Sequence, residues 1–271
     1  MMELKTIEIK KWEQDKWVEK SDFLAVEEPL EIRLQYFENG IIQSKSVSIT
    51  MRTPNFDKEL AIGFLFTESI LTDLSQVDKI EQINENQISV YVKEGVGLSL
   101  NKLDRNFYTT SSCGVCGKSS LDAIKTVPPS VFSSKTISIS KDKILSLKDK
   151  INQRQSNFSQ TGGIHASALF NLEGNLISIF EDVGRHNALD KLIGHHFLKG
   201  NTDLSQNILL LSGRASFELI QKAVAAKIQI VCAIGAPSSL AVDLAKEFNV
   251  TLIGFLKNES FNIYSSPLRI I

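Results

Sequence analysis

The sequence is poor in cysteine, has no long apolar run and carries no excess of either charge. Three of its 271 residues are cysteine, and residues 1–20 lack the apolar core of a secretory signal, so we expect free thiols in a reducing cytoplasm. No apolar stretch approaches the roughly 18–20 residues that span a membrane. The 30 basic and 31 acidic residues give a net charge of −1, which offers no general attraction to nucleic acid or to a membrane surface. The composition therefore predicts a cytoplasmic globular protein that has neither nucleic acid nor a membrane as a partner.

Three common nucleotide-binding and zinc-binding motifs are also missing. The sequence contains no Gly-x-x-x-x-Gly-Lys-Ser/Thr and no Gly-x-Gly-x-x-Gly, which excludes ordinary P-loop and Rossmann sites. It also lacks the His-x-Glu followed by Pro-Cys-x-x-Cys that holds zinc in nucleotide deaminases. Because the zinc-binding motif is absent, we predict no metal site.

Two of the three cysteines lie in one short segment, Cys113-Gly114-Val115-Cys116-Gly117. Ser119 and Asp122 follow at the spacing of a capping box, which predicts a helix that begins just after this segment. The unpaired N–H groups of the first helical turn, with Lys118 beside them, favour negative charge, so we expect a lowered pKa for a nearby cysteine. The segment therefore indicates thiolate chemistry on a glycine-containing loop.

Three other interpretations of the two cysteines stay open. A zinc site needs four ligands, but the third cysteine, Cys232, lies in the apolar run 228–234, which is typical of a buried strand. Zinc would then have to recruit two of the four histidines, although His165 fits a core residue equally well and His195 and His196 look like packing or surface residues of a helix. A thioredoxin-like redox pair lacks the expected βαβ pattern upstream. A structural loop with inert thiols is the third alternative.

The order of the predicted elements divides the chain into three parts. Residues 1–110 form a β-rich part, with a hairpin turn at Asn39-Gly40 and one helix that residues 53–57 open. The cysteine segment and its helix occupy residues 111–135. In residues 136–271 helices alternate with apolar strands, which predicts α/β layers around a largely parallel sheet. The predicted strands are 23–26, 30–36, 47–51, 79–82, 87–92, 164–170, 176–180, 207–211, 228–233 and 250–255, and the later helices are 141–155, 187–199, 217–227 and 239–248.

Three loops of the α/β part are rich in groups that bind anions. They contain Gly213 and Arg214 in one loop, small residues and hydroxyls at 235–239 in the second, and Arg185 with His186 in the third. Each loop alone fits an ordinary capped helix start. Because ligands bind at the carboxyl edge of such sheets, the three together predict a phosphate-bearing ligand.

Nine sequence blocks run through nearly the whole chain: Arg52-Thr53-Pro54, 59–64, 113–117, 161–165, 181–191, Ser212-Gly213-Arg214, Ala236-Pro237, 240–242 and 261–264. In this order they resemble the formate dehydrogenase accessory sulfurtransferase family, FdhD, and the run 181–191 is the most specific of them. The resemblance implies an α/β fold whose C-terminal part is a cytidine-deaminase-like three-layer sandwich without the zinc ligands, joined to the β-rich N-terminal part.

The resemblance also implies that the protein carries sulfur. A cysteine desulfurase would pass persulfide sulfur to Cys113, with Cys116 as its partner. The protein, a sulfurtransferase, would deliver the sulfur to the molybdenum (or tungsten) bis(molybdopterin guanine dinucleotide) cofactor before that cofactor enters formate dehydrogenase. The cofactor is then a bound substrate, and no permanently bound cofactor is expected. The resemblance further implies a homodimer.

The same resemblance places the contacts to this guanine nucleotide-containing cofactor near the C-terminus. Lys257 stands where the family often has arginine, which replaces a bidentate phosphate contact by a point charge. A cofactor-binding chaperone without sulfur turnover and a degenerate deaminase-like enzyme are the alternative functions. The implied contacts are Phe255, Leu256, Lys257, Asn258, Glu259 and Ser260, and the anion-binding loops add Gly213, Arg214, Arg185 and His186.

Overall fold

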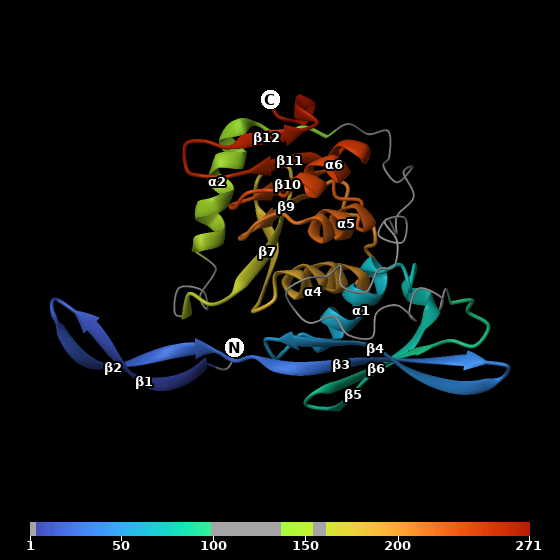
Figure 1. Ribbon diagram of the computed structural model, residues 1–271. Coiled ribbons are helices and arrows are strands. Elements are labelled where there is room, and N and C mark those ends of the chain that lie inside the picture. The colour runs from blue at the N-terminus through green and yellow to red at the C-terminus, as the bar shows by residue number, and fades with distance from the viewer. Residues whose placement is uncertain (1–3, 99–136, 154–160) are drawn as a thin grey trace.

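The computed structural model describes residues 4–98, 137–153 and 161–271, and their strands form three sheets (Figure 1). A six-stranded sheet with helices on its faces forms the upper part of the view, and a four-stranded sheet lies below it. A two-stranded hairpin extends to the left.

The six-stranded sheet is mixed and has parallel strands at its centre. In spatial order its strands are β12 (Asn262–Ser265), β11 (Thr251–Gly254), β10 (Ile230–Ala233), β9 (Ile208–Leu211), β7 (His165–Phe170) and β8 (Leu176–Asp182). β9, β10 and β11 pair in parallel, and the outer strands are antiparallel to their neighbours. Every residue of the three parallel strands is buried. This confirms the expectation that strands without polar alternation are covered on both faces.

Helices cover both faces of this sheet and make the three-layer sandwich that the resemblance implied. Ile208 and Leu210 of β9 share one hydrophobic cluster with α2. Leu209 and Leu211 share another with α4, α5 and α6 on the opposite face. Successive side chains of a strand point to opposite faces, so one short strand joins both layers. The helices are α2 (Lys141–Asn152), α4 (Arg185–Leu198), α5 (Phe217–Ala225) and α6 (Ser239–Glu247).

The N-terminal part is a four-stranded sheet covered by one helix. Its strand order is β4-β3-β6-β5, and β3 turns into β4 through Asn39 and Gly40, whose φ angles are 52° and 75°, as the dipeptide predicted. α1 packs on this sheet in a cluster that also contains Phe197 of α4. The elements are β3 (Glu28–Glu38), β4 (Ile41–Arg52), α1 (Asp57–Thr67), the 3-10 helix η1 (Leu74–Gln76), β5 (Val77–Asn84) and β6 (Gln87–Val92).

The structure contains two features that the sequence pattern did not predict: most of one hairpin and the last strand. β1 (Leu4–Glu13) and β2 (Lys16–Ala25) pair antiparallel, whereas only residues 23–26 were predicted as a strand. No residue of either strand is buried, so the pattern of a half-buried strand is weak there. β12 is a four-residue edge strand with two exposed residues, followed by the 3-10 helix η4 (Pro267–Arg269).

Some expectations lie outside the described residues. They are the cysteine segment with Cys113 and Cys116 and the helix expected to follow it. The division of the chain at residues 110 and 135 stays a prediction. Over the described ranges, no helix is both long enough and apolar enough to cross a membrane.

α1 and α4 cross with their backbones in contact. A Cβ atom at Gly63 would overlap the carbonyl oxygen of Asp190, and a Cβ at Gly194 would overlap that of Glu59. Because both obstacles are backbone atoms, turning a side chain cannot relieve either overlap. Glycine at these two positions therefore sets the distance between the helices and, through them, between the two larger sheets.

We expect Gly63→Ala to lower the midpoint of thermal unfolding, because the added methyl group forces α1 away from α4. Overpacking of this kind costs about 1–3 kcal/mol or more. Gly97→Ala is the matched control, since a Cβ there meets no atom within 4 Å. Scanning calorimetry of both variants measures the effect. If Gly63→Ala unfolds at the wild-type temperature, the backbone contact does not limit this packing.

Candidate functional site

The carboxyl edge of the six-stranded sheet brings together segments that are far apart in the sequence. The three parallel strands end there, and the antiparallel β7 begins there at His165, opposite Asp182 at the end of β8. The loops 212–216, 234–238 and 255–261 therefore lie side by side, and Ser216 of the first loop contacts His186 in the first turn of α4. Open α/β sheets bind their ligands at this edge.

Backbone hydrogen bonds continue past the strand ends and hold these loops together. The N–H of Ser212 donates to a carbonyl of β7 at 3.0 Å, and the N–H of Gly235 donates to Gly213 at 2.9 Å. Phe255 N–H in turn donates to the carbonyl of Gly235 at 3.1 Å. A Cβ atom at Gly235 would lie 3.0 Å from the backbone nitrogen of Arg214. The loops pack this closely because the residue is glycine.

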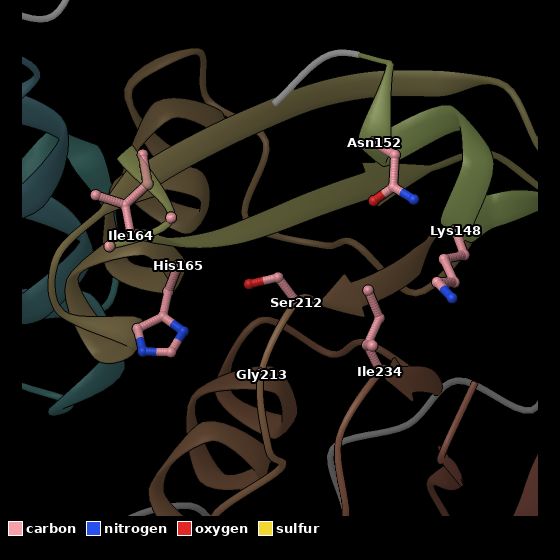
Figure 2. Close-up of a pocket in the computed structure, with 9 residues that line it drawn as sticks. Lys148, Asn152, Ile164, His165, Ser212, Gly213 and Ile234 are labelled. Carbon is pink, nitrogen blue, oxygen red and sulfur yellow. The ribbon is translucent and has the colours of Figure 1, made fainter. Parts of the chain in front are cut away.

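A cavity of about 440 Å³ opens at this edge, between α2, the start of β7 and the loop after β9 (Figure 2). Figure 2 shows Lys148 and Asn152 of α2 on one side and His165 on the other. Glycines present backbone to the cavity, which allows a ligand to approach closely. With the charge of Lys148, this lining suits a polar anion. The lining residues are Lys148, Asn152, Gly162, Gly163, Ile164, His165, Ser212, Gly213 and Ile234.

Arg185 adds positive charge beside His165. It is the first residue of α4, and its Nε is buried with no hydrogen-bond partner in the described part of the chain. Burial, and then the charge of Arg185, lower the pKa of His165, while Asp182 opposes the shift. At neutral pH His165 is therefore an uncharged imidazole, and the charge of Arg185 lies close enough to act on it. The positive charge of Arg185 favours an anion such as phosphate at this edge.

His186 lies on the same helical turn but contacts α5. Its Nε2 is 3.4 Å from Ser216 Oγ and 3.9 Å from Glu218 Oε2. Burial lowers the pKa of His186 to about 4, and Lys222 and Arg185 act in the same direction. His186 is therefore neutral at pH 7 and packs α4 against α5.

The predicted segment 255–260 forms a turn at the same edge. Leu256 is fully buried in the cluster that contains α2, whereas Phe255 is 43% exposed. Asn258 Nδ2 donates to Asp149 Oδ1 of α2 at 3.1 Å. The turn therefore rests against the helix that lines the cavity. Leu256 anchors it and leaves its other side chains exposed.

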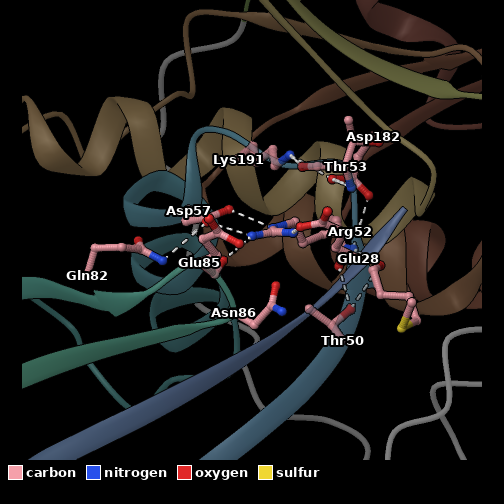
Figure 3. A network of polar contacts seen from close by, with 12 residues as sticks. Glu28, Thr50, Arg52, Thr53, Asp57, Gln82, Glu85, Asn86, Asp182 and Lys191 are labelled. Carbon is pink, nitrogen blue, oxygen red and sulfur yellow. Dashed lines mark hydrogen bonds and ion pairs between the residues drawn. The ribbon is translucent and has the colours of Figure 1, made fainter. Parts of the chain in front are cut away.

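A buried polar network fixes the start of α4 (Figure 3). Asp182 accepts hydrogen bonds from the N–H groups of Thr53 at 3.1 Å and Gly184 at 2.8 Å, and it pairs with Lys191 Nζ at 2.7 Å. Lys191 Nζ also donates to the carbonyl of Thr53 at 2.7 Å. Burial raises the pKa of Asp182, and Lys191 opposes that rise. Thr53, which follows β4, is thus hydrogen-bonded to Asp182 and to Lys191, the two residues that flank Arg185 in the sequence.

Arg52 extends the network into the four-stranded sheet. Its side chain is buried and donates to both carboxylate oxygens of Asp57, at 2.9 and 3.0 Å, and to the carbonyl of Glu85 at 2.7 Å. A two-point contact between arginine and a carboxylate fixes orientation as well as distance. Because Thr53 follows Arg52 directly, this contact sets the position from which Thr53 reaches Asp182.

Cys232 is the free cysteine among the described residues, and its thiol is fully buried in β10. Burial raises the pKa of this thiol, which makes it a poor nucleophile. This confirms the prediction of a buried strand residue. Across residues 4–98, 137–153 and 161–271, no group of three or more His, Cys, Asp and Glu side chains could hold a metal ion.

The structure brings most of the predicted contact residues to one edge but adds others. Gly213 lines the cavity, and the exposed Arg214 follows it. Lys148 and Asn152 were predicted only as part of the helix 141–155 and not as contact residues. Their spacing of four residues, which puts both on one helical face, was the only local signal.

The sequence profile of the FdhD/NarQ family matches residues 25–271. The chain belongs to this family. It is 46% identical over 261 residues to the sulfur carrier protein FdhD of Streptomyces avermitilis, over 93% of this chain and 90% of the relative. It is 39% identical over 269 residues to the sulfur carrier protein FdhD of Sulfolobus acidocaldarius, over 99% of both chains.

A solved structure also has the same fold. It comes from Desulfotalea psychrophila, is described as a formate dehydrogenase accessory protein, and matches with a TM-score of 0.75 over 99% of both chains. Sequence identity in that comparison is 22%, so it bears on the fold alone. The FdhD/NarQ match confirms the family resemblance, and its range includes Cys113 and Cys116.

We expect Arg185→Gln to raise the pKa of His165, because the variant removes a nearby positive charge. An NMR titration of the four histidine rings measures this shift. Lys199→Gln is the control: Lys199 lowers the pKa values of His195 and His196 and is not among the causes at His165. An unchanged His165 titration in Arg185→Gln would contradict the described placement of the guanidinium.

Proposed function

We propose that this protein is a cytoplasmic sulfurtransferase that carries persulfide sulfur on Cys113. The donor is a cysteine desulfurase. The acceptor is the molybdenum bis(molybdopterin guanine dinucleotide) cofactor, which is bound at the sheet edge before it enters formate dehydrogenase. The observation that carries the proposal is the family match over residues 25–271, with curated relatives that are named sulfur carrier proteins.

Burial favours the paired cysteines over the third one as sulfur carriers. The chain has three cysteines, and Cys232 is enclosed between α2 and the sheet. A carrier must reach both a donor and an acceptor, and its thiolate is the attacking species. Cys113 and Cys116 are therefore the candidates for the transfer.

The two paired thiols can complete the transfer between them. The Cys113 thiolate attacks the outer sulfur of the donor persulfide, and the donor leaves as a thiolate, so this exchange needs no oxidant. The Cys116 thiolate then attacks the inner sulfur on Cys113. A disulfide forms between Cys113 and Cys116, and hydrosulfide leaves for the acceptor. An external dithiol reduces the disulfide and returns both thiols.

The cationic sheet edge supports binding of the cofactor as cargo. Its guanine nucleotides carry pyrophosphate groups, which suit helix N-termini and arginine. Lys148 lines the cavity, the charge of Arg185 acts on His165 in its wall, and Arg214 stands in the loop that leads into α5. The exposed turn 255–260 is the proposed contact for a guanine base. This arrangement holds the cofactor only while it is being loaded.

Cys113→Ser should accept little or no sulfur from a desulfurase, whereas Cys116→Ser should accept it and release it more slowly. The reason is that only Cys113 bears the persulfide and Cys116 expels it. Mass spectrometry of each variant after incubation with a desulfurase and cysteine measures loading, and transfer to a thiol acceptor measures release.

Cys232→Ala is the matched control for this experiment and should load like the wild type. If Cys116 proves indispensable for loading, the two roles are reversed. If Cys113→Ser still supports full formate dehydrogenase activity, the protein acts as a cofactor-binding chaperone without sulfur turnover.

We expect guanosine diphosphate to bind at the sheet edge with measurable heat in a calorimetric titration. Arg214→Ala should weaken this binding by about 1.5–3 kcal/mol, the range for a hydrogen bond to a charged group. Lys246→Ala should not, because Lys246 lies in the last turn of α6, away from the carboxyl edge. Equal affinity for adenosine diphosphate would show general anion capture instead of guanine recognition.

A further inference from the structure

The β1–β2 hairpin is long and separate from the rest of the protein. Its strands pair over ten positions, from Leu4 with Ala25 to Glu13 with Lys16. Among the described residues neither strand pairs with a third one, and none of their side chains belongs to a hydrophobic cluster. Figure 1 shows the hairpin extending away from both larger sheets. An isolated two-stranded hairpin is marginally stable in water, so this one needs a further partner.

The outer edge of β1 presents unpaired backbone groups. Gln14 and Asp15 have φ angles of 51° and 58°, which is typical of a two-residue type I′ turn, so the flanking Glu13 and Lys16 form a hydrogen-bonded pair. Along β1 the backbone groups then point alternately toward β2 and away from it. The residues whose N–H and C=O point away are Thr6, Glu8, Lys10 and Trp12. Such an edge is a template for another strand.

The charges of β1 are complementary to those of a second β1 that runs antiparallel and is centred on Ile9. In that register Glu8 faces Lys10 of the second copy, and Lys10 faces Glu8. Lys5 and Glu13 also face each other across the contact. Opposite charges at directly facing positions stabilise a sheet. A contact between two β2 strands centred on Glu19 or on Lys20 would instead place like charges opposite each other.

The exposed aromatic residues fit the same register. Trp12 and Trp17 are 56% and 66% exposed, and their rings meet edge to face with centroids 5.2 Å apart. Trp12 would face Thr6 of the second copy. In that copy Thr6 of β1 is paired with Phe23 of β2. Phe23 is itself 42% exposed, so the indoles of one copy would cover it in the other. Tryptophan is a frequent anchor of protein interfaces.

We propose that β1 pairs with β1 of a second copy of this chain, antiparallel and centred on Ile9, in a four-stranded sheet β2-β1-β1-β2. The contact is two-fold symmetric, so it closes with two chains and leaves neither β1 edge open. The family profile begins at residue 25, so nearly all of the hairpin lies outside the residues that the profile matches.

Disulfide trapping tests the register. In a Cys113→Ser, Cys116→Ser background, Ile9→Cys places two thiols at a facing, non-hydrogen-bonded position with Cα atoms about 4.5 Å apart, which a disulfide can bridge. Ile7→Cys is the matched control, because position 7 faces Lys11 of the second copy. Mild oxidation should give a covalent dimer of the full-length chain with Ile9→Cys and not with Ile7→Cys. Equal trapping of both, or of neither, would overturn the proposal.

Reversing single charges tests this seam, the contact between the two β1 strands, separately from the folding of the hairpin. Lys10→Glu creates a like-charge pair with Glu19 in its own hairpin and another with Glu8 across the seam, whereas Glu19→Lys creates one only within the hairpin. Trapping through Ile9→Cys should slow about tenfold for Lys10→Glu and stay near the reference rate for Glu19→Lys. A mixture of Glu8→Lys and Lys10→Glu chains restores opposite charges and should recover trapping. No recovery in the mixture would contradict this seam.

Discussion

The ion pair between Asp182 and Lys191 is the contact on which the candidate site depends. Both side chains are shielded from solvent, at 0% and 1% exposure, and Thr53 completes the pair by donating to one partner and accepting from the other. A buried charge that loses its partner costs about 3–5 kcal/mol, so these three groups hold one another in place. Arg185 lies between the two charged residues in the chain and takes its position from them.

Local sequence patterns were sufficient for most of the α/β part and for the loops at its edge. β9, β10 and β11 are apolar throughout, and small or hydroxyl residues follow two of them, so their ends could be predicted. The cavity could not be predicted in the same way, because Lys148 reaches it through the packing of α2 on the sheet. The position of the His186 side chain could not be predicted either, because its contacts are with Ser216 and Glu218 of another segment. The first hairpin was missed because it has no buried face.

The described site is suited to bind an anionic ligand reversibly. Three glycines are among its lining residues, Lys148 lines it and Arg185 is a nearby cation, and no metal-binding cluster occurs within the described ranges. A hydrogen bond from a neutral backbone group contributes only about 0.5–1.5 kcal/mol. Such contacts suit an anion that has to be passed on. The fully buried Cys232 also keeps a third thiol away from any sulfur that the other two carry.

The bond between Thr53 and Asp182 joins residues 129 positions apart, and this separation constrains the order of events during synthesis. The N-terminal part leaves the ribosome first, but α4, on which the Gly63 face of α1 packs, is made more than a hundred residues later. Until then that face of α1 is uncovered, and the backbone groups of Thr53 lack their charged partners. Contacts between such distant segments form slowly, and exposed apolar surface promotes aggregation in the meantime. The nascent chain is therefore most vulnerable between the completion of its first sheet and the arrival of α4.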